Sequence, residues 1–411
     1  MPDTLAAVRA PQTEMHLSKE FRALLAIRAV FWVIILSVPI YAHRADAQDA
    51  PAPFHVAAFD VGDVLGNAAG GLRTGARVLD KLDLTASYLA EADGPLSGWS
   101  AFADLQWTDA VDFNGTLAGS LQGVSNIDAP SGVRLLDAWV ARDFGGVGGI
   151  KAGIVDLNSE FDVQTTGALF LNPSHGIGPD FSQSGENGPS IFPSTGLGII
   201  AWWLPGAHWQ LKAGLFEGIS GDPAHPGRES IALTAREGVL IVVEARNHVT
   251  EHFVLGAGAW VYTAAFDTFG GGRSHANSGV YAIADGKLIA VDGHDDQGLS
   301  AWLRAGVANA ATNPVQAYVG GGIVYTGILA DGDQAGFAAG SVMLGAPARD
   351  AAMRAGQPLG SGETTLEATY SVPVTDWLTV QPDLQYVISP GADPTLGDAL
   401  VIGSRATLTW N

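Results

Sequence analysis

The sequence predicts an all-β fold: a transmembrane antiparallel β-barrel of about 16 strands with a long loop folded into the lumen. Three observations predict it. Only 15% of the 411 residues are charged, against about 25% in soluble domains. Short segments alternate apolar and polar residues along most of the chain. Finally, the chain begins with a pattern typical of secreted proteins, and no later segment supplies the roughly 18 apolar residues of a membrane helix.

The N-terminal segment predicts export. Arg22 and Arg28 precede an apolar run over Ala29–Ala42, and an A-x-A cleavage site follows at Ala45–Ala47. This basic, apolar and small-residue order is that of a secretory signal peptide, and its apolar run is too short to span a membrane. We therefore expect residues 1–47 to be a signal peptide and residues 48–411 to form one outer-membrane barrel domain.

The mature chain then repeats the pattern of a membrane strand, in which apolar side chains face lipid and polar ones face the lumen. Between Arg77 and Leu89, apolar Val78, Leu82 and Leu84 alternate with polar side chains. The same alternation recurs in the segments 99–108, 299–307, 363–372, 378–386 and 400–411. Turn sequences such as DFGGVGG at 143–149 and SPGADP at 389–394 separate the strands. With no break in composition, we expect a single closed barrel.

The stretch Lys151–Thr195 interrupts the alternation. It starts as a short strand and then has no periodicity for about 35 residues, and insertions this long are usually functional. Its apolar side chains, which include Phe161, Phe170 and Phe181, can pack against a wall. We therefore interpret it as a loop folded into a pore.

Composition also excludes several classes of site. Cysteine is absent, which excludes disulfides and thiolate chemistry. The formal net charge is −21, and a nucleic-acid partner would require clusters of Lys and Arg. We expect no cofactor and no metal.

Three stretches carry a resemblance to a known family. They are KAGIVDLNSEF with GALFLNPSHGIGP at the long loop, GVYAIAD at 279–285, and the C-terminal QPDLQYVISPG with DALVIGSRATLTW. They resemble the carbohydrate-selective outer-membrane porins of the OprB family. The resemblance implies a sixteen-stranded barrel in the bacterial outer membrane through which sugars diffuse. Family members generally end on an aromatic residue, whereas here Asn411 follows Trp410.

A sugar channel needs a narrow lumen whose polar groups replace the solute's lost hydration. Sugar hydroxyls bond to carboxylates, amides and guanidinium groups, and sugar C–H faces pack on aromatic rings. The predicted pore-lining residues are Arg77, Lys81, Asp83, Asp137, Trp139, Asp156, Asn158, Glu160, Trp302, Arg304, Gln381, Asp383, Gln385 and Arg405.

Each of these residues has a structural alternative. An inward charge in a wide barrel is commonly solvated or paired across strands, and Trp302 could pack beneath the inserted loop. Asn158 at a strand end favours a turn, whereas Glu160 favours the constriction. Phe161, Phe170 and Phe181 fit loop anchors better than stacking platforms.

Catalytic motifs are weaker. Ser174, His175 and Asp180 lie close together without a nucleophile elbow, and His248, Glu251 and His252 fall between strands and not on the helix that a zinc motif needs. We therefore expect a passive porin for glucose-like sugars and no enzyme.

Two kinds of alternative function stay open. Among porins, the alternative is a general or ion-selective porin. Among other classes, the alternatives are a barrel enzyme and a structural or adhesive protein. Expected partners are carbohydrate solutes, outer-membrane lipid and lipopolysaccharide, and a homo-oligomer stays open.

Overall fold

The computed structural model describes residues 53–109, 112–223, 237–291 and 293–410. The predicted signal peptide, residues 1–47, lies outside the described residues. None of the helices in this part of the chain is long and apolar enough to cross a membrane.

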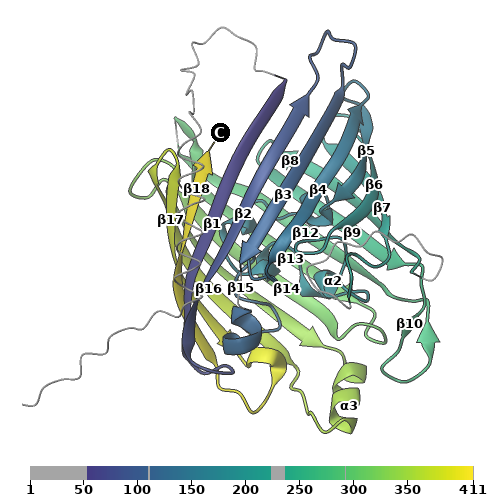
Figure 1. The fold of residues 1–411 in the computed structure, drawn as a ribbon, viewed down its shortest axis with the longest axis vertical. Helices are drawn as coiled ribbons and strands as arrows, with labels where there is room; N and C mark the ends of the chain where they lie inside the picture. The colour runs from purple at the N-terminus through teal and green to yellow at the C-terminus, as the bar shows by residue number, and fades with distance from the viewer. Residues whose placement is uncertain (1–52, 110–111, 224–236, 292, 411) are drawn as a thin grey trace, which may run out of the picture. The chain divides into compact units, whose positions relative to one another are not determined.

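Sixteen of the described strands form one closed antiparallel barrel, which confirms the predicted fold. Its last strand pairs with its first, from Ala58 opposite Trp410 to Ala69 opposite Leu400, so the barrel itself closes without an unpaired edge. Figure 1 shows the strands inclined to the barrel axis. The barrel strands are β1 (Phe54–Ala69), β2 (Gly75–Leu89), β3 (Trp99–Asp109), β4 (Gly132–Asp143), β5 (Gly148–Val155), β6 (Gly196–Trp203), β7 (Trp209–Glu217), β8 (Val239–Thr250), β9 (Phe253–Tyr262), β12 (Ser278–Val291), β13 (His294–Ala308), β14 (Val315–Thr326), β15 (Gln334–Leu344), β16 (Gly362–Thr375), β17 (Leu378–Ile388) and β18 (Ala399–Trp410).

The connections differ in length at the two ends of the barrel. Strands are joined by short turns at one end and mostly by longer loops at the other, where β10 (Phe266–Asp267) and β11 (Arg273–Ser274) form a small separate sheet. In bacterial barrels the short turns are periplasmic and the longer loops extracellular. The loops also carry the short helices η1 (Asn114–Ala118), η2 (Leu157–Ser159), η3 (Gly167–Leu169), η4 (Pro173–His175), α2 (Pro179–Ser182), α3 (Ala346–Arg354) and η5 (Pro390–Ala392).

The alternation of apolar residues produces an apolar outer wall. Val78, Leu84 and Leu303 are each more than 40% exposed because they point away from the lumen. Large exposed aromatic side chains border the short turns, as expected at a membrane interface. They are Phe54, Trp99, Phe144, Trp203, Trp209 and Trp377.

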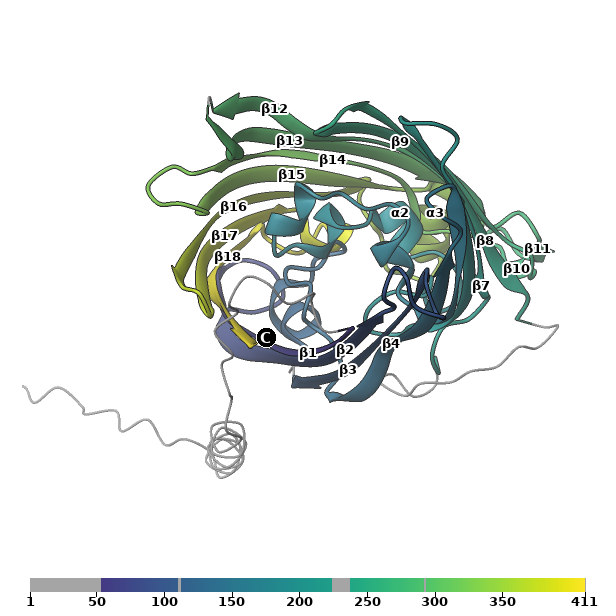
Figure 2. The same cartoon turned by 90° about the horizontal axis from the view of Figure 1, so that it is seen from above.

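Two segments fold back into the lumen, where their apolar side chains pack against the inner face of the strands. We call residues 112–131 the second loop and residues 156–195 the third loop, in their order at the long-loop end. Figure 2 shows α2 of the third loop inside the ring of strands. Phe161, Phe170 and Phe181 of this loop are at most 1% exposed, which confirms them as anchors.

Candidate functional site

The third loop begins halfway along the barrel. β5 and β6 have only 8 residues each, whereas β1 has 16. Val155, the last residue of β5, pairs with Gly196, the first residue of β6. The 40 residues between these strands therefore leave the wall at mid-height and fill the lumen instead of rising above it.

Carboxylates on the lumen wall bind backbone amides of this loop. Glu244 on β8 accepts a hydrogen bond from the amide of Asp162 at 2.8 Å. Asp285 on β12 accepts one from the amide of Thr166 at 3.1 Å. Because hydrogen bonds to ionised groups are stronger than those between neutral groups, these wall acids hold the loop backbone at several separate points.

Arg304 on β13 is the central ion-pair anchor of the third loop. The guanidinium is fully buried; its Nη2 lies 2.7 Å from Oδ2 of Asp162, and its Nη1 binds Asp180. Removing one partner from a buried pair of this kind typically costs about 3–5 kcal/mol. Arg304 therefore faces the loop and not open lumen, which differs from its predicted pore-lining place. The partners lie 142 and 124 positions away in the sequence.

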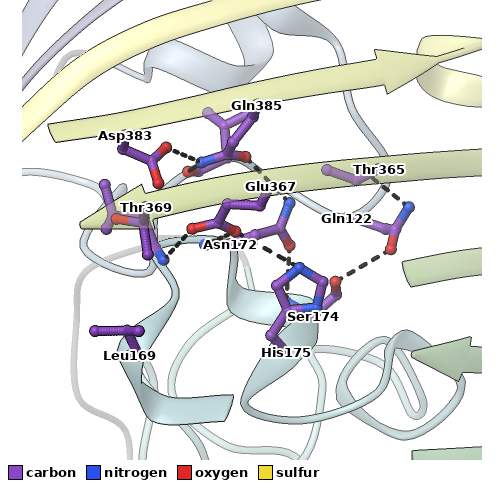
Figure 3. Close-up of polar contacts among 12 residues, drawn as sticks. Gln122, Leu169, Asn172, Ser174, His175, Thr365, Glu367, Thr369, Asp383 and Gln385 are labelled. Carbon is purple, nitrogen blue, oxygen red and sulfur yellow. Dashed lines mark hydrogen bonds and ion pairs between the residues drawn. The ribbon is translucent and has the colours of Figure 1, made fainter. Parts of the chain in front are cut away.

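Figure 3 shows a second anchor, where Glu367 on β16 meets η4. Its carboxylate accepts hydrogen bonds from the amides of Leu171 at 2.6 Å and Asn172 at 3.1 Å. The Nε2 atom of His175 lies 3.5 Å from it. Burial lowers the pKa of His175 to about 3, so this imidazole is neutral and packs between the rings of Phe170 and Trp302.

The predicted pore-lining residues of β13 and β17 lie beneath the same loops. Trp302 is 3% exposed and belongs to the cluster around Phe170. It therefore packs beneath the inserted loop, which is the structural alternative to lining the pore. Gln381 donates to the carbonyl of Leu169 at 2.7 Å. Gln385 donates to the carbonyl of Val124 at 2.7 Å and to the carboxylate of Asp383 at 2.9 Å.

The second loop is held in the same way, and the sequence did not single it out. Glu363 on β16 accepts hydrogen bonds from the hydroxyl of Ser120 and the amide of Leu121, both at 2.7 Å. Arg405, a predicted pore-lining residue, pairs with Asp63 at 2.7 Å and donates to Asn126 at 2.8 Å. The alternation places such acids on the lumen face, but it does not show that they bind loop amides.

The start of the third loop combines turn formation and charge. Asp137 on β4 accepts a hydrogen bond from the amide of Asp156 at 2.9 Å, and Asp156 in turn caps the amide of Asn158 at 2.8 Å. The Asn158 amide group donates to three loop carbonyls. These bonds stabilise a turn, as expected for an Asn at a strand end. Glu160 bridges Lys212 at 2.6 Å and Lys151.

The loop carboxyls at this point have shifted pKa values. Burial and the neighbouring Asp137 raise the pKa of Asp156 to about 7. Burial also raises the pKa of Asp162 to about 6, although Arg304 opposes the shift. For Glu160 the effect of burial is outweighed by Lys212 and Lys151, which hold its pKa below the usual value.

The remaining predicted residues lie on the wall of β2 and β4. Lys81 pairs with Asp83, which also accepts a hydrogen bond from Gln106 at 2.8 Å. Arg77 donates to the adjacent carbonyl of Ala76. The ring of Trp139 stacks on Phe102, and the Lys151 ammonium lies 3.8 Å from the centre of that indole.

A hollow of about 370 Å³ is lined by both inserted loops. Its lining mixes apolar and neutral polar side chains, the acids are Asp128 and Asp156, and no Lys or Arg contributes. The neutral polar lining residues are Gln122, Ser125, Asn126, Asn158, Asn172, Ser174, Ser182 and Gln183. The hollow therefore offers hydrogen-bonding groups beside apolar surface, with little charge.

Comparisons with known proteins agree with this geometry. A family model described as the carbohydrate-selective porin, OprB family, matches residues 107–410. Porin B of Pseudomonas aeruginosa is 30% identical over 142 residues, which make up 31% of this chain and 31% of that protein. The match thus spans about a third of the length of this curated relative.

Solved structures share the fold. The high-pH structure of Pseudomonas putida OprB matches with a TM-score of 0.77 and 20% identity, over 87% of this chain and 94% of that one. The outer membrane channel DcaP of Acinetobacter baumannii matches with a TM-score of 0.55 and 10% identity, over 88% and 99%. At these identities the likeness shows the barrel fold.

Proposed function

The chain belongs to the carbohydrate-selective porins of the OprB family, and we propose that it is a passive channel for neutral, glucose-sized sugars across the bacterial outer membrane. The family and the fold are those of an outer-membrane channel. The observation that carries the choice of solute is the hollow between the second and third loops, which offers hydroxyl and amide groups and no cation. Such groups replace the hydration of a neutral polyol without binding it so tightly that it cannot leave.

The size of the hollow supports small sugars. At about 370 Å³ it lies near the lower end of the roughly 300–1,000 Å³ found for small-molecule sites. The loops that form the hollow are anchored by buried charged side chains, so they have little freedom to move apart and widen it. We therefore expect monosaccharides to pass faster than disaccharides.

We infer that the channel has no enzymatic role. The contacts of Ser174, His175 and Asp180 do not link these side chains as a catalytic triad. The Asp180 carboxylate binds Arg304, the Ser174 hydroxyl donates to Gln122 at 3.1 Å, and His175 is neutral and buried. These contacts support loop anchoring for all three side chains.

We further propose that the apolar outer wall contacts outer-membrane lipid, with lipopolysaccharide around the long-loop end. A homo-oligomer would have to form through this same wall. Cross-linking in native outer membranes distinguishes the two arrangements, because a lipid-covered barrel stays at monomer mass.

Liposome swelling tests the proposed solute. Proteoliposomes in iso-osmotic glucose should swell, swell more slowly in a disaccharide, and swell least in a sugar acid of similar size. Equal rates for all three solutes would support the general porin instead, and no swelling would remove the channel function. Liposomes without protein are the control.

A further inference from the structure

Two aromatic rings and two carboxylates lie side by side on the lumen face of β3 and β4. Phe102 is directly opposite Trp139, and Asp104 is directly opposite Asp137. Each pair is two residues from the other along its strand, so all four side chains point to the same face. The group is separate from the hollow between the loops, because none of the four residues lines that hollow.

The group lies on the short-turn side of the third loop. Trp139 pairs with Gly153 on β5, and β5 ends two residues later, at Val155, where the loop leaves the wall. A solute that has passed the loops from the long-loop end therefore meets this group next.

The two rings stack against each other and together present apolar surface to the lumen. Their centroids are 5.6 Å apart and their planes differ by 30°. The Lys151 ammonium lies over the Trp139 ring on the β5 side, 3.8 Å from its centre, whereas Phe102 extends the aromatic group toward β2. Both rings are only half-buried. Aromatic surface facing a polar lumen is unfavourable unless a solute covers it.

The two carboxylates are unequally satisfied. Like charges directly opposite one another destabilise a sheet. The Asp137 carboxylate is stabilised by a hydrogen bond from the amide of Asp156. Asp104 is 8% exposed, and its Oδ1 has no hydrogen-bond partner in the part of the chain that the structure describes. A buried acceptor without a donor costs free energy, so this oxygen points to a ligand that brings a donor.

We propose that Phe102, Trp139, Asp104 and Asp137 form a second carbohydrate subsite on the periplasmic side of the constriction. The apolar face of a pyranose covers the rings, and its hydroxyls donate to the Asp104 carboxylate. This inference rests on the proposed function. It adds a weak site that receives the sugar after the loops, and several weak sites in series favour release over trapping.

The test is the block of single-channel current by glucose added on the short-turn side. Trp139→Leu should weaken the apparent affinity about five- to tenfold, the loss expected from one aromatic contact, measured relative to the variant's own sugar-free current. Trp139→Phe should restore most of the affinity. Trp203→Leu is the matched control, because this Trp is 58% exposed on the outer wall, and it should leave the block unchanged.

Asp104→Asn supplies an independent test, since it keeps the side-chain shape and can be measured even if the ring variants do not fold. It should weaken glucose block while raising thermal stability, because it removes the repulsion from Asp137. A merely structural aspartate would not move the two readouts in opposite directions.

The outcomes separate this inference from the proposed function. If wild-type channels are blocked by glucose and both Trp139→Leu and Asp104→Asn match them, the four residues are solvated wall and the subsite is wrong, while the sugar channel stands. If wild-type protein shows neither block nor sugar flux, the proposed function fails and the subsite with it.

Discussion

The lumen wall has two regions that differ in what their polar side chains contact. Along β12 to β18, Arg304, Glu363 and Glu367 are buried beneath the inserted loops and bind them. Along β2 to β4, Lys81 and Trp139 lie partly exposed on the lumen face. The same apolar and polar alternation produces both regions. The difference teaches that a lumen-facing charge either holds the constriction or meets the solute, according to whether a loop covers it.

Breaking the covered region should have the largest effect. Arg304→Met leaves Asp162 and Asp180 buried without their cation, and removing one partner of such a pair costs about 3–5 kcal/mol. We expect the third loop to leave the wall, with a severalfold rise in single-channel conductance and loss of sugar discrimination. Arg77→Met, on the uncovered wall, is the matched control and should leave the conductance close to wild type.

The triple variant Arg304→Met, Asp162→Asn, Asp180→Asn removes the whole charge cluster. It should recover part of the lost docking, because no charge is then left buried and unpaired. A single variant that conducts like wild type would show that the ion pairs do not position the loop.

A neutral substitution at the second anchor should have an intermediate effect. Glu367→Gln keeps the size of the side chain but replaces two hydrogen bonds to an ionised group by weaker neutral ones, a loss of about 1–3 kcal/mol. We expect frequent current fluctuations and faster hydrogen exchange at the amides of Leu171 and Asn172. Hydrogen exchange by mass spectrometry measures this directly, and unchanged protection of those amides would contradict the anchor.

At the start of the third loop, the charge of Glu160 should alter ion preference and not pore size. Glu160→Gln leaves the ammonium groups of Lys151 and Lys212 without a carboxylate between them. The lumen becomes less negative by one charge, so the ratio of cation to anion permeability should fall while conductance changes little. Reversal potentials in a KCl gradient measure the ratio. A large conductance change would instead place Glu160 among the loop anchors.

The smallest expected effect is a pH dependence at the start of the third loop. The pKa of Asp156 is about 7 because burial and Asp137 disfavour its charged form. Below that pH the carboxyl is neutral, and above it the group adds a negative charge, so cation preference should rise with pH through a midpoint near 7. Asp156→Asn should abolish this step, and a step that persists in the variant would assign the titration to another group.

The strands and the third loop could be predicted because they depend on local patterns. Alternation identifies a strand from its own residues, and the loss of alternation after Val155 marks the loop. The anchors depend on contacts over long sequence separations. Arg304 meets Asp162 across 142 positions, and Glu363 meets Ser120 across 243. Nothing in the local sequence distinguishes these charges from Lys81 and Asp83, which pair with each other on β2.

The insertion of the second loop was missed for a related reason. Its large apolar side chains, Phe113, Leu117, Val124 and Ile127, are buried, but the segment is about half as long as the third loop, so its loss of alternation stands out less. Besides these apolar contacts, the Glu363 carboxylate and the pairing of Arg405 with Asp63 hold it in the lumen. A sequence signal does exist on β16, where Glu363 and Glu367 share one face, but a pair of acids on a lumen face is equally typical of a solvated wall.

The most direct test of a sugar-conducting pore is the current of wild-type protein in a planar bilayer as glucose is added. We predict a current that falls saturably with glucose, falls less with a disaccharide that enters the hollow poorly, and returns when the sugar is removed. A current that sugars leave unchanged, together with strong ion selectivity in a salt gradient, would contradict it and identify an ion-selective porin.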